Sequence, residues 1–273
     1  MNPASPTPKL RLNIGAGLSP RVEGQINADL YPGPNIDVVF DATKKWPFPD
    51  NSIGVVTGTH VLEHLADPWA FFAEAWRVLA PSKDCNLQLR LPYGLSEAGF
   101  GDLTHVRQWV PGSFCCFQPG YNEAVFNPQH DGWKSPFSVL SVYLRIDPGL
   151  RWLLKPVIRR WGLPLIRFMA GAFTEMIVGM RALKRDVDVL RWKMDNQANV
   201  VPVGYCMYEH EYYQNRPLAP RQTPRWLFFG EGARYLQKLY DSTYKKWPQA
   251  FSDDQLVAAV EAVRPQEASN GRG

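Results

Sequence analysis

The stretch LNIGAGLSPRVEGQINADL, residues 12–30, contains two short apolar runs that are joined by a glycine-bearing turn. Runs of this length and apolar character predict buried strands. Gly15 and Gly17 follow the first run and lack a β-carbon, so the backbone there can turn tightly and lie against a ligand. Asp29 ends the second run. We place the two strands at residues 10–14 and 25–30.

The rest of the first half continues the alternation of short apolar runs with turns and helical stretches. This pattern is typical of a parallel sheet that helices cover on both faces. Two longer runs downstream could form an antiparallel pair at the sheet edge. We therefore expect an α/β fold with a doubly wound, Rossmann-like, mostly parallel sheet of seven strands and an antiparallel edge pair. The further strands are expected at residues 37–40, 52–57, 87–91, 137–144 and 173–183.

The clearest helix is expected between the fourth and fifth strands. Asp67 can cap its N-terminus, and Pro68 stands in the first turn, where its missing N–H does no harm. Phe72, Trp76 and Leu79 recur at helical spacing, so this face should pack on the sheet. We expect Pro81 to stop the helix.

Two later segments differ in composition from the sheet region. Residues 149–172 combine five basic residues and several large apolar ones with no acidic residue, and predict a short helical insertion. Residues 186–273 are rich in tyrosine and proline before two helical stretches, the last beginning at Ser252 with Gln255 as the partner in a capping box. We expect one domain at 1–185 and a C-terminal extension at 186–273 of unknown role.

Composition sets broad limits on the class of protein. The 273 residues are 45% hydrophobic and 21% charged with a net charge of +4, which is typical of a globular protein and does not demand a nucleic-acid partner. The four cysteines form no C-x-x-C pair, and no apolar run is long enough to span a bilayer. The N-terminus lacks the apolar core of a signal peptide. We therefore expect a cytoplasmic protein.

The polar residues that follow successive strands suggest a ligand site. In open parallel sheets ligands bind at the carboxyl ends of the strands. Here these ends supply the glycine turn, Asp29, Asp41 and His60 in order. A carboxylate can accept hydrogen bonds from ribose hydroxyls or an adenine amino group, although each acid taken alone also suits a helix cap or turn.

The run from residue 12 to residue 68 resembles the class I, type 11 group of S-adenosylmethionine-dependent methyltransferases. The likeness rests on LNIGAG, on WPFPD before the fourth strand, on HVLEHLADP after it, and on EAWRVLAPS, LRLPYG and GDLTHVRQW further along. It is close over about 10–115 and looser to about 184. It implies methyl transfer from S-adenosylmethionine, with S-adenosylhomocysteine as the product.

The resemblance also implies which residues hold the cofactor. The glycine turn would contact its methionine part, Asp29 its ribose, and Asp41 with Ala42 its adenine. His60 would lie near the sulfonium. Asn13 replaces an acid that many relatives carry, which alters the grip on the methionine amine. The full expected set is Asn13, Gly15, Ala16, Gly17, Asp29, Leu30, Asp41, Ala42 and His60.

The stretch GTHVLEHLADP, residues 58–68, has a second interpretation. His60, Glu63 and His64 have the H-x-x-E-H spacing of one class of zinc peptidase. That motif needs both histidines within one long helix and a third ligand, whereas His60 directly follows a strand. We therefore expect no metal ligands here, and interpret His64 as a core or turn histidine.

Catalysis by in-line methyl transfer depends mainly on positioning and needs no covalent nucleophile. A hydroxyl acceptor would benefit from a general base, for which His105 is the candidate, with His60 as the second catalytic candidate. His105 could equally be a structural histidine bound to a backbone carbonyl. Tyr93, just after the fifth strand, could line the pocket or merely pack.

The acceptor class is only partly limited by sequence. An Asp/Asn-Pro-Pro-Tyr element and a Pro-Cys nucleophile are both missing, which disfavours nucleic-acid bases as acceptors. We expect a small-molecule, sugar or lipid-linked acceptor. Residues 149–172 could meet a membrane or lipid-linked partner, or could simply pack over the sheet edge. The alternative function is a catalytically degenerate methyltransferase fold that serves as a binding or assembly module.

Overall fold

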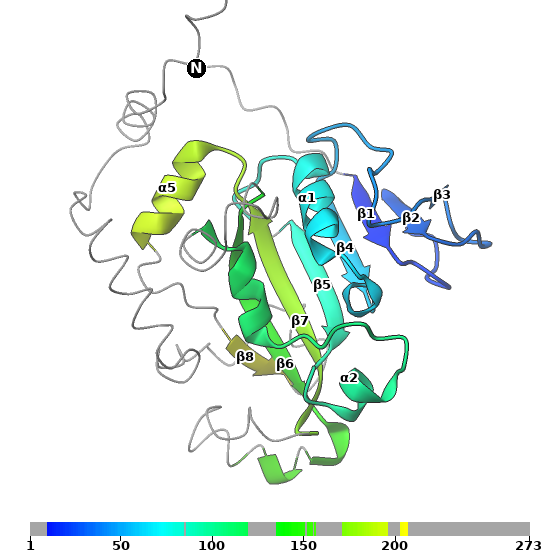
Figure 1. Ribbon diagram of the computed structural model, residues 1–273, viewed down its shortest axis with the longest axis vertical. Helices are drawn as coiled ribbons and strands as arrows, with labels where there is room; N and C mark the ends of the chain where they lie inside the picture. The colour runs from blue at the N-terminus through cyan, green and yellow to red at the C-terminus, as the bar shows by residue number, and fades with distance from the viewer. Residues whose placement is uncertain are drawn as a thin grey trace, which may run out of the picture.

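The computed structural model describes residues 10–84, 86–119, 135–150, 152–154, 156, 171–195 and 203–206. These residues form an eight-stranded sheet in the order β3-β2-β1-β4-β5-β7-β6-β8 (Figure 1). Its strands are β1 (Arg11–Ile14), β2 (Gln25–Asp29), β3 (Val38–Val39), β4 (Val55–Thr59), β5 (Leu87–Pro92), β6 (Phe137–Ile146), β7 (Phe173–Ala182) and β8 (Val203–Cys206). The expected α/β fold is confirmed.

Strand direction follows the expected pattern. The pairs β3–β2, β2–β1, β1–β4 and β4–β5 are parallel. The strand β7 runs antiparallel to both of its neighbours, β5 and β6. The expected antiparallel pair is therefore present, but β8 lies outside it, parallel to β6. This eighth strand comes from the segment that we assigned to the C-terminal extension, whose boundary and role stay predictions.

The principal helix, α1 (Pro68–Val78), begins as expected. The side chain of Asp67 accepts hydrogen bonds from the backbone N–H groups of Trp69 and Ala70. The helix ends at Val78, earlier than the expected stop at Pro81, because the chain turns extended at Leu79 and pairs with the segment before β4.

The buried face of α1 is wider than the spacing predicted. Phe71, Phe72, Ala75 and Val78 are buried, whereas Trp76 is only partly buried. The indole N–H of Trp76 instead donates to the carbonyl oxygen of Leu183, 3.1 Å away. Trp76 thereby ties α1 to the segment that follows β7.

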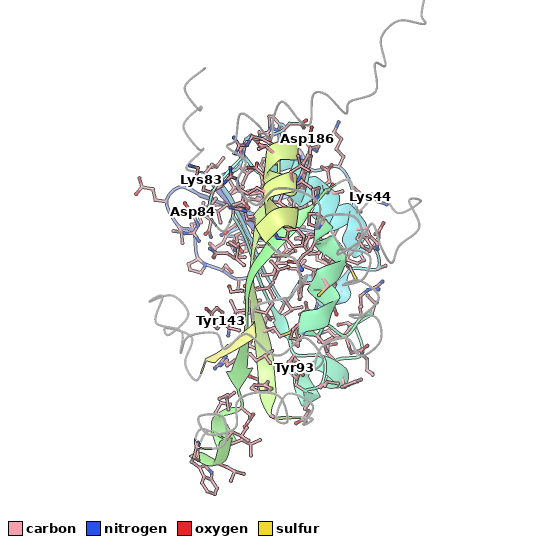
Figure 2. The ribbon with its side chains drawn as sticks, turned by 90° about the vertical axis from the view of Figure 1, so that its left-hand side faces the viewer. Lys44, Lys83, Asp84, Tyr93, Tyr143 and Asp186 are labelled. Atoms are coloured by element: carbon pink, nitrogen blue, oxygen red, sulfur yellow. The ribbon has the colours of Figure 1, made fainter. Side chains whose placement is uncertain are left out.

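A second helical segment covers the same face of the sheet. The 3-10 helix η2 (Pro111–Phe117) stacks Phe117 on Phe72 of α1, with ring centroids 3.7 Å apart. Figure 2 shows the sheet nearly edge-on, with α1 to one side of it. Apolar strand residues that alternate toward this side form the core with it, among them Leu12, Val56, Leu87, Leu89, Val142 and Val178.

The opposite face of the sheet is polar near β1 and β2. The link between these strands is a loop, and Asn27 fixes it. Its side-chain amide donates to the carbonyl oxygen of Asn35 at 3.1 Å and also approaches those of Ser19 and Pro20. Asn27 is 1% exposed, so these contacts satisfy a buried amide. The loop keeps the end of β1 beside the end of β2.

The remaining described elements are short. They include η1 (Leu62–His64), α2 (Glu97–Gly101), η4 (Pro148–Leu150) and α5 (Asp186–Asp195). Among the described residues, no helix has the length and hydropathy needed to cross a membrane. Most of the expected insertion at 149–172 and the expected capping box at Ser252 lie outside the described residues.

Candidate active site

The glycine turn after β1 is shaped by backbone conformation and by close packing. Gly15 and Gly17 have φ angles of 65° and 51°, a region that side chains with a β-carbon rarely adopt. A β-carbon on Gly15 would also overlap Cγ2 of Val61, which follows β4. The turn therefore packs against the segment after β4, and both features favour glycine at position 15.

Asp29 lies beside this turn at the end of β2. Its Oδ2 accepts the backbone N–H of Gly17 at 2.9 Å, and its Oδ1 accepts that of Tyr31 at 3.1 Å. An ionised carboxylate has about four acceptor positions, so further capacity remains for a ligand hydroxyl. The glycine turn and Asp29 are therefore in direct contact, and their roles in cofactor binding stay predictions.

Asp41 follows β3 on the same edge of the sheet. Its Oδ1 accepts from the hydroxyl of Thr43 at 2.7 Å and from the backbone N–H of Thr43 at 2.8 Å. These bonds, the side-chain one first, lower the pKa of Asp41, so the carboxylate is ionised at neutral pH. The carbonyl oxygen of Ala42 accepts the indole N–H of Trp46 at 3.0 Å, which fixes the turn after β3.

Three further residues of the expected cofactor set are Asn13, Leu30 and Ala16. The amide of Asn13 donates to Asn27 at 3.2 Å and accepts the hydroxyl of Thr57 at 3.3 Å, so it links β1 to both neighbouring strands. Leu30 is 52% exposed directly after Asp29. Ala16 is buried in the turn, where its N–H donates to the carbonyl of Ala28.

His60 is held between two carboxylates. Its φ angle is 54°, its Nε2 lies 3.0 Å from Oε1 of Glu175, and its Nδ1 lies 3.2 Å from Oε1 of Glu63. The contacts with Glu175 and then Glu63 raise the pKa of His60 to about 9. The imidazole is therefore protonated at neutral pH and carries no lone pair to accept another proton.

Glu175 forms ion pairs with three cationic side chains. Besides His60, it accepts from Arg90 of β5 at 2.8 and 3.1 Å and from Arg145 of β6 at 2.5 Å. Burial alone would raise the pKa of Glu175, but the hydrogen bonds from these three groups hold it below the usual range. This network joins β4, β5, β6 and β7 near the site.

His105 lies in the loop that follows α2. Its side chain is 5% exposed, its Nδ1 lies 3.1 Å from the carbonyl oxygen of Gly99, and its Nε2 lies 3.7 Å from Oδ2 of Asp102. A carbonyl oxygen can only accept, so Nδ1 carries the proton and Nε2 keeps its lone pair in the neutral ring. His64 packs beside it, with ring centroids 4.9 Å apart.

A cavity of about 550 Å³ lies near the ends of β5 and β7. Three of its lining residues are acidic, and none of the residues that line it is basic. The set comprises Ser96, Glu97, Ala98, Gly101, Asp102, Asp147, Gly171, Phe173 and Thr174. Tyr93 is 1% exposed and packs edge-on against Phe173, so it lies behind this wall in the core.

The structure brings the expected residues together in two groups. Gly17, Asp29 and Asp41 lie at or just after the carboxyl ends of β1, β2 and β3, which are adjacent and parallel. His60 follows the carboxyl end of β4, and His105 lies beyond the end of β5. The roles of all these residues in binding or catalysis stay predictions.

Sequence reasoning missed the partners that fix His60. Glu63 was visible within the same short motif, and its spacing from His60 could have indicated the contact. Glu175 lies 115 residues from His60, so nothing local indicates that pairing. Arg90 and Arg145 are likewise found only through the strand order.

Comparison with known proteins gives one match to a family model. A model described as a methyltransferase domain matches residues 17–85, the segment that holds Gly17, Asp29, Asp41 and His60. No curated protein matches the chain. The family model therefore likens this segment to a methyltransferase domain.

Several solved structures resemble the chain weakly. The YcgJ protein from Bacillus subtilis has 16% identity and a TM-score of 0.39, over 66% of this chain and 93% of its own. A SAM-dependent methyltransferase from Archaeoglobus fulgidus has 16% identity and a TM-score of 0.41, over 64% of this chain and 86% of its own. Another, from Mesorhizobium loti, has 11% identity and a TM-score of 0.36, over 65% of this chain and 94% of its own. Likeness at this level supports no argument about substrate or partner.

Proposed function

We propose that the chain is a class I S-adenosylmethionine-dependent methyltransferase that transfers the methyl group to a hydroxyl or amino group of a small-molecule or sugar acceptor. The observation that carries the proposal is the placement of Gly17, Asp29 and Asp41 at the ends of three adjacent parallel strands. This is the edge at which open α/β sheets bind ligands.

The residues at this edge suit the cofactor chemically. The glycine turn exposes backbone to a ligand, and the carboxylate of Asp29 offers acceptor positions for the two ribose hydroxyls. Asp41 offers an ionised acceptor one strand further along. S-adenosylmethionine supplies an activated methyl group, so the protein has mainly to bind, orient and exclude water.

The geometry favours His105 over His60 as the group that accepts a proton. His60 is already protonated and bound on both ring nitrogens. His105 has its Nδ1 fixed by the carbonyl of Gly99, which leaves Nε2 directed near Asp102. Asp102 also lines the cavity, so an acceptor hydroxyl bound there would lie near this imidazole. His60 then serves to hold the end of β4 in place.

The cavity supports a polar acceptor. Glu97, Asp102 and Asp147 supply carboxylate oxygens, which accept hydrogen bonds from hydroxyl groups and attract protonated amines. Its volume of about 550 Å³ suits a small ligand. Sugars and amino alcohols fit this lining better than apolar or anionic acceptors.

The proposal is tested by a transfer assay with S-adenosylmethionine labelled in its methyl group. Sugars, amino alcohols and fractions of cell extract are offered as acceptors, and labelled product is identified by mass spectrometry. We expect His105→Ala to lower kcat by about 10²–10⁴-fold with the cofactor affinity unchanged, as for loss of a general base. The comparison variant is His130→Ala, which removes the next histidine along the chain. Equal activity of His105→Ala and His130→Ala would refute the base assignment.

The alternative function is a binding or assembly module that has lost catalysis. It is favoured by Asn13, which stands where many relatives have an acid and whose amide is already engaged by Asn27 and Thr57. Calorimetry separates the two functions, because a degenerate module need bind neither S-adenosylmethionine nor S-adenosylhomocysteine. Heat from either ligand at one site per chain supports the enzyme.

A further inference from the structure

A compact group of possible metal ligands lies beside the proposed site. Glu63, His64 and His105 each present one donor atom, and these atoms all lie within 4.8 Å of one another. Two loops bring them together: the backbone N–H of Val106 donates to the carbonyl of Glu63 at 2.9 Å, and Nδ1 of His64 lies 3.1 Å from the hydroxyl of Thr104. The cluster therefore joins the segment after β4 to the loop after α2.

Glu63 is a buried carboxylate that is paired with His60 but has unused hydrogen-bond acceptor capacity. Its side chain is 2% exposed, and neither carboxylate oxygen makes a hydrogen bond. The Nδ1 of His60 lies 3.2 Å from Oε1, which forms an ion pair but lies outside hydrogen-bond geometry. Burying a carboxylate without hydrogen bonds is costly, and metal coordination is one of the ways in which proteins offset that cost.

Both histidines are oriented as metal ligands usually are. The Nδ1 of His105 faces the carbonyl oxygen of Gly99 at 3.1 Å, and the Nδ1 of His64 faces the carbonyl oxygen of Thr104 at 3.3 Å. A ligating histidine commonly donates its other ring N–H to such an oxygen, which fixes the tautomer and the ring orientation. In each ring Nε2 is then the nitrogen available to a metal.

We propose that Glu63, His64 and His105 bind a divalent transition-metal ion of the zinc class. Two imidazole nitrogens and one carboxylate oxygen suit Zn²⁺, whereas Mg²⁺ and Ca²⁺ prefer oxygen ligands throughout. With bonds of about 2.1 Å, donor atoms around such an ion lie roughly 3.5 Å apart, so the side chains must close by about 1 Å. His64 is exposed, so its ring has room for that movement.

This arrangement differs from the zinc-peptidase pattern that the spacing of His60 and His64 suggested. His60 binds Glu175 through Nε2 and faces Glu63 through Nδ1, so it is a neighbour of the metal site and not a ligand. Three protein ligands leave at least one coordination position open. The metal would also occupy Nε2 of His105, so zinc binding is expected to inhibit a transfer that uses this nitrogen as the base.

The test measures metal binding directly and needs no acceptor. Full-length protein is treated with a chelator, then titrated with Zn²⁺ by calorimetry and with Co²⁺ by visible absorption. We expect one ion per chain and intense Co²⁺ bands, which indicate a coordination number below six. His64→Ala is the main variant, because this side chain is exposed and its loss should leave the fold intact. We expect its affinity for Zn²⁺ to fall by about 100-fold or more, beyond the 10–100-fold effect of losing an outer partner.

Glu63→Gln and His105→Ala should weaken zinc binding similarly, with circular dichroism to confirm that each folds. His130→Ala and His210→Ala remove the two histidines outside the described residues and should bind zinc normally. Asp29→Ala should also bind zinc normally, which separates this site from the cofactor site. Absence of stoichiometric zinc binding, or zinc affinity that depends on His130 or His210 and not on His64, would overturn the proposal.

Discussion

At the scale of single residues, two glycines of the same turn carry different constraints. Gly15 and Gly17 both have positive φ angles, but only Gly15 lies against a neighbour, the Cγ2 of Val61. A β-carbon on Gly17 would meet no atom within 4 Å. The two positions therefore separate the cost of backbone conformation from the cost of overlap.

We expect Gly15→Ala to destabilise the protein more than Gly17→Ala does. The added overlap with Val61 should cost about 1–3 kcal/mol beyond the shared backbone strain. Urea unfolding of both variants measures the difference. Val61→Ala combined with Gly15→Ala should recover most of the added loss. Equal unfolding free energies for Gly15→Ala and Gly17→Ala would show that Val61 does not pack on Gly15.

Cys116 offers a test of burial in η2. Burial raises the pKa of its thiol to about 11, so about one thiol in a thousand is ionised at pH 8. We expect alkylation of Cys116 by iodoacetamide to rise about tenfold per pH unit from pH 8 to pH 10 in the folded protein. In urea the rate should level off above about pH 9, near the ordinary pKa. Peptide mapping by mass spectrometry measures this site separately.

The raised pKa of Cys116 also makes the stability of the protein depend on pH. The pKa of the Cys116 thiol is higher in the folded protein than in the unfolded chain. The protonated thiol therefore contributes fully to the free energy of unfolding below about pH 8.5, and this contribution is lost as the pH rises toward 11. An alkylation rate at pH 8 that is equal in folded and unfolded protein would contradict the burial of Cys116.

At the scale of elements, the network around Glu175 links four strands. Its carboxylate is 13% exposed and receives His60, Arg90 and Arg145. Removing one partner of a buried charge network leaves the others uncompensated. The strand β7 is therefore held to its neighbours by charge as well as by backbone pairing.

We expect Glu175→Gln to lower the free energy of unfolding by about 3 kcal/mol, because three cations lose their common anion. The matched control is Arg185→Gln, which removes an exposed pair with Asp188 and should change stability by less than about 1 kcal/mol. Urea unfolding at neutral pH measures both variants. A change in Glu175→Gln no larger than that in Arg185→Gln would indicate that solvent screens the network.

Strands and helix ends could be predicted where the local sequence pattern determines them. Seven strands and the cap of α1 at Asp67 follow from short apolar runs and turn residues, and all are present. The strand β4 is shifted from the expected 52–57 to Val55–Thr59, because Ile53 bridges to Leu79 instead. The strand β8 was missed because its four residues show no alternation that distinguishes them from the tyrosine-rich surroundings.

The sequence predicts which site residues lie together only where they follow strands that are consecutive in the chain. Gly17 and Asp29 could be paired because β1 and β2 are adjacent both in sequence and in the sheet. The proximity of Glu63 to His105 and the contact of His60 with Glu175 depend on loop docking and strand order across 42 and 115 residues. Such contacts arise from tertiary packing, which no local propensity encodes.

At the scale of the whole molecule, the sheet divides the site into two parts. The ends of β1, β2 and β3 carry the proposed cofactor residues, and the cavity with Asp102 and Asp147 lies beyond β5 and β7. The strand β4 lies between β1 and β5 (Figure 1), and His60, which follows β4, is bound to Glu175 of β7. A donor on one side and an acceptor on the other would meet near β4.

The most direct test of this account is a calorimetric titration with S-adenosylhomocysteine of the wild type, Asp29→Ala and Asp84→Ala. Asp84 is exposed and distant in sequence from the site (labelled in Figure 2), so its replacement controls for the loss of one carboxylate. We expect the wild type and Asp84→Ala to bind one ligand per chain with equal affinity. Asp29→Ala should bind about 100-fold more weakly, as for the loss of about 2.7 kcal/mol of hydrogen bonding to the ribose. Equal affinity of Asp29→Ala and the wild type, or no binding by any of the three, would contradict the central claim.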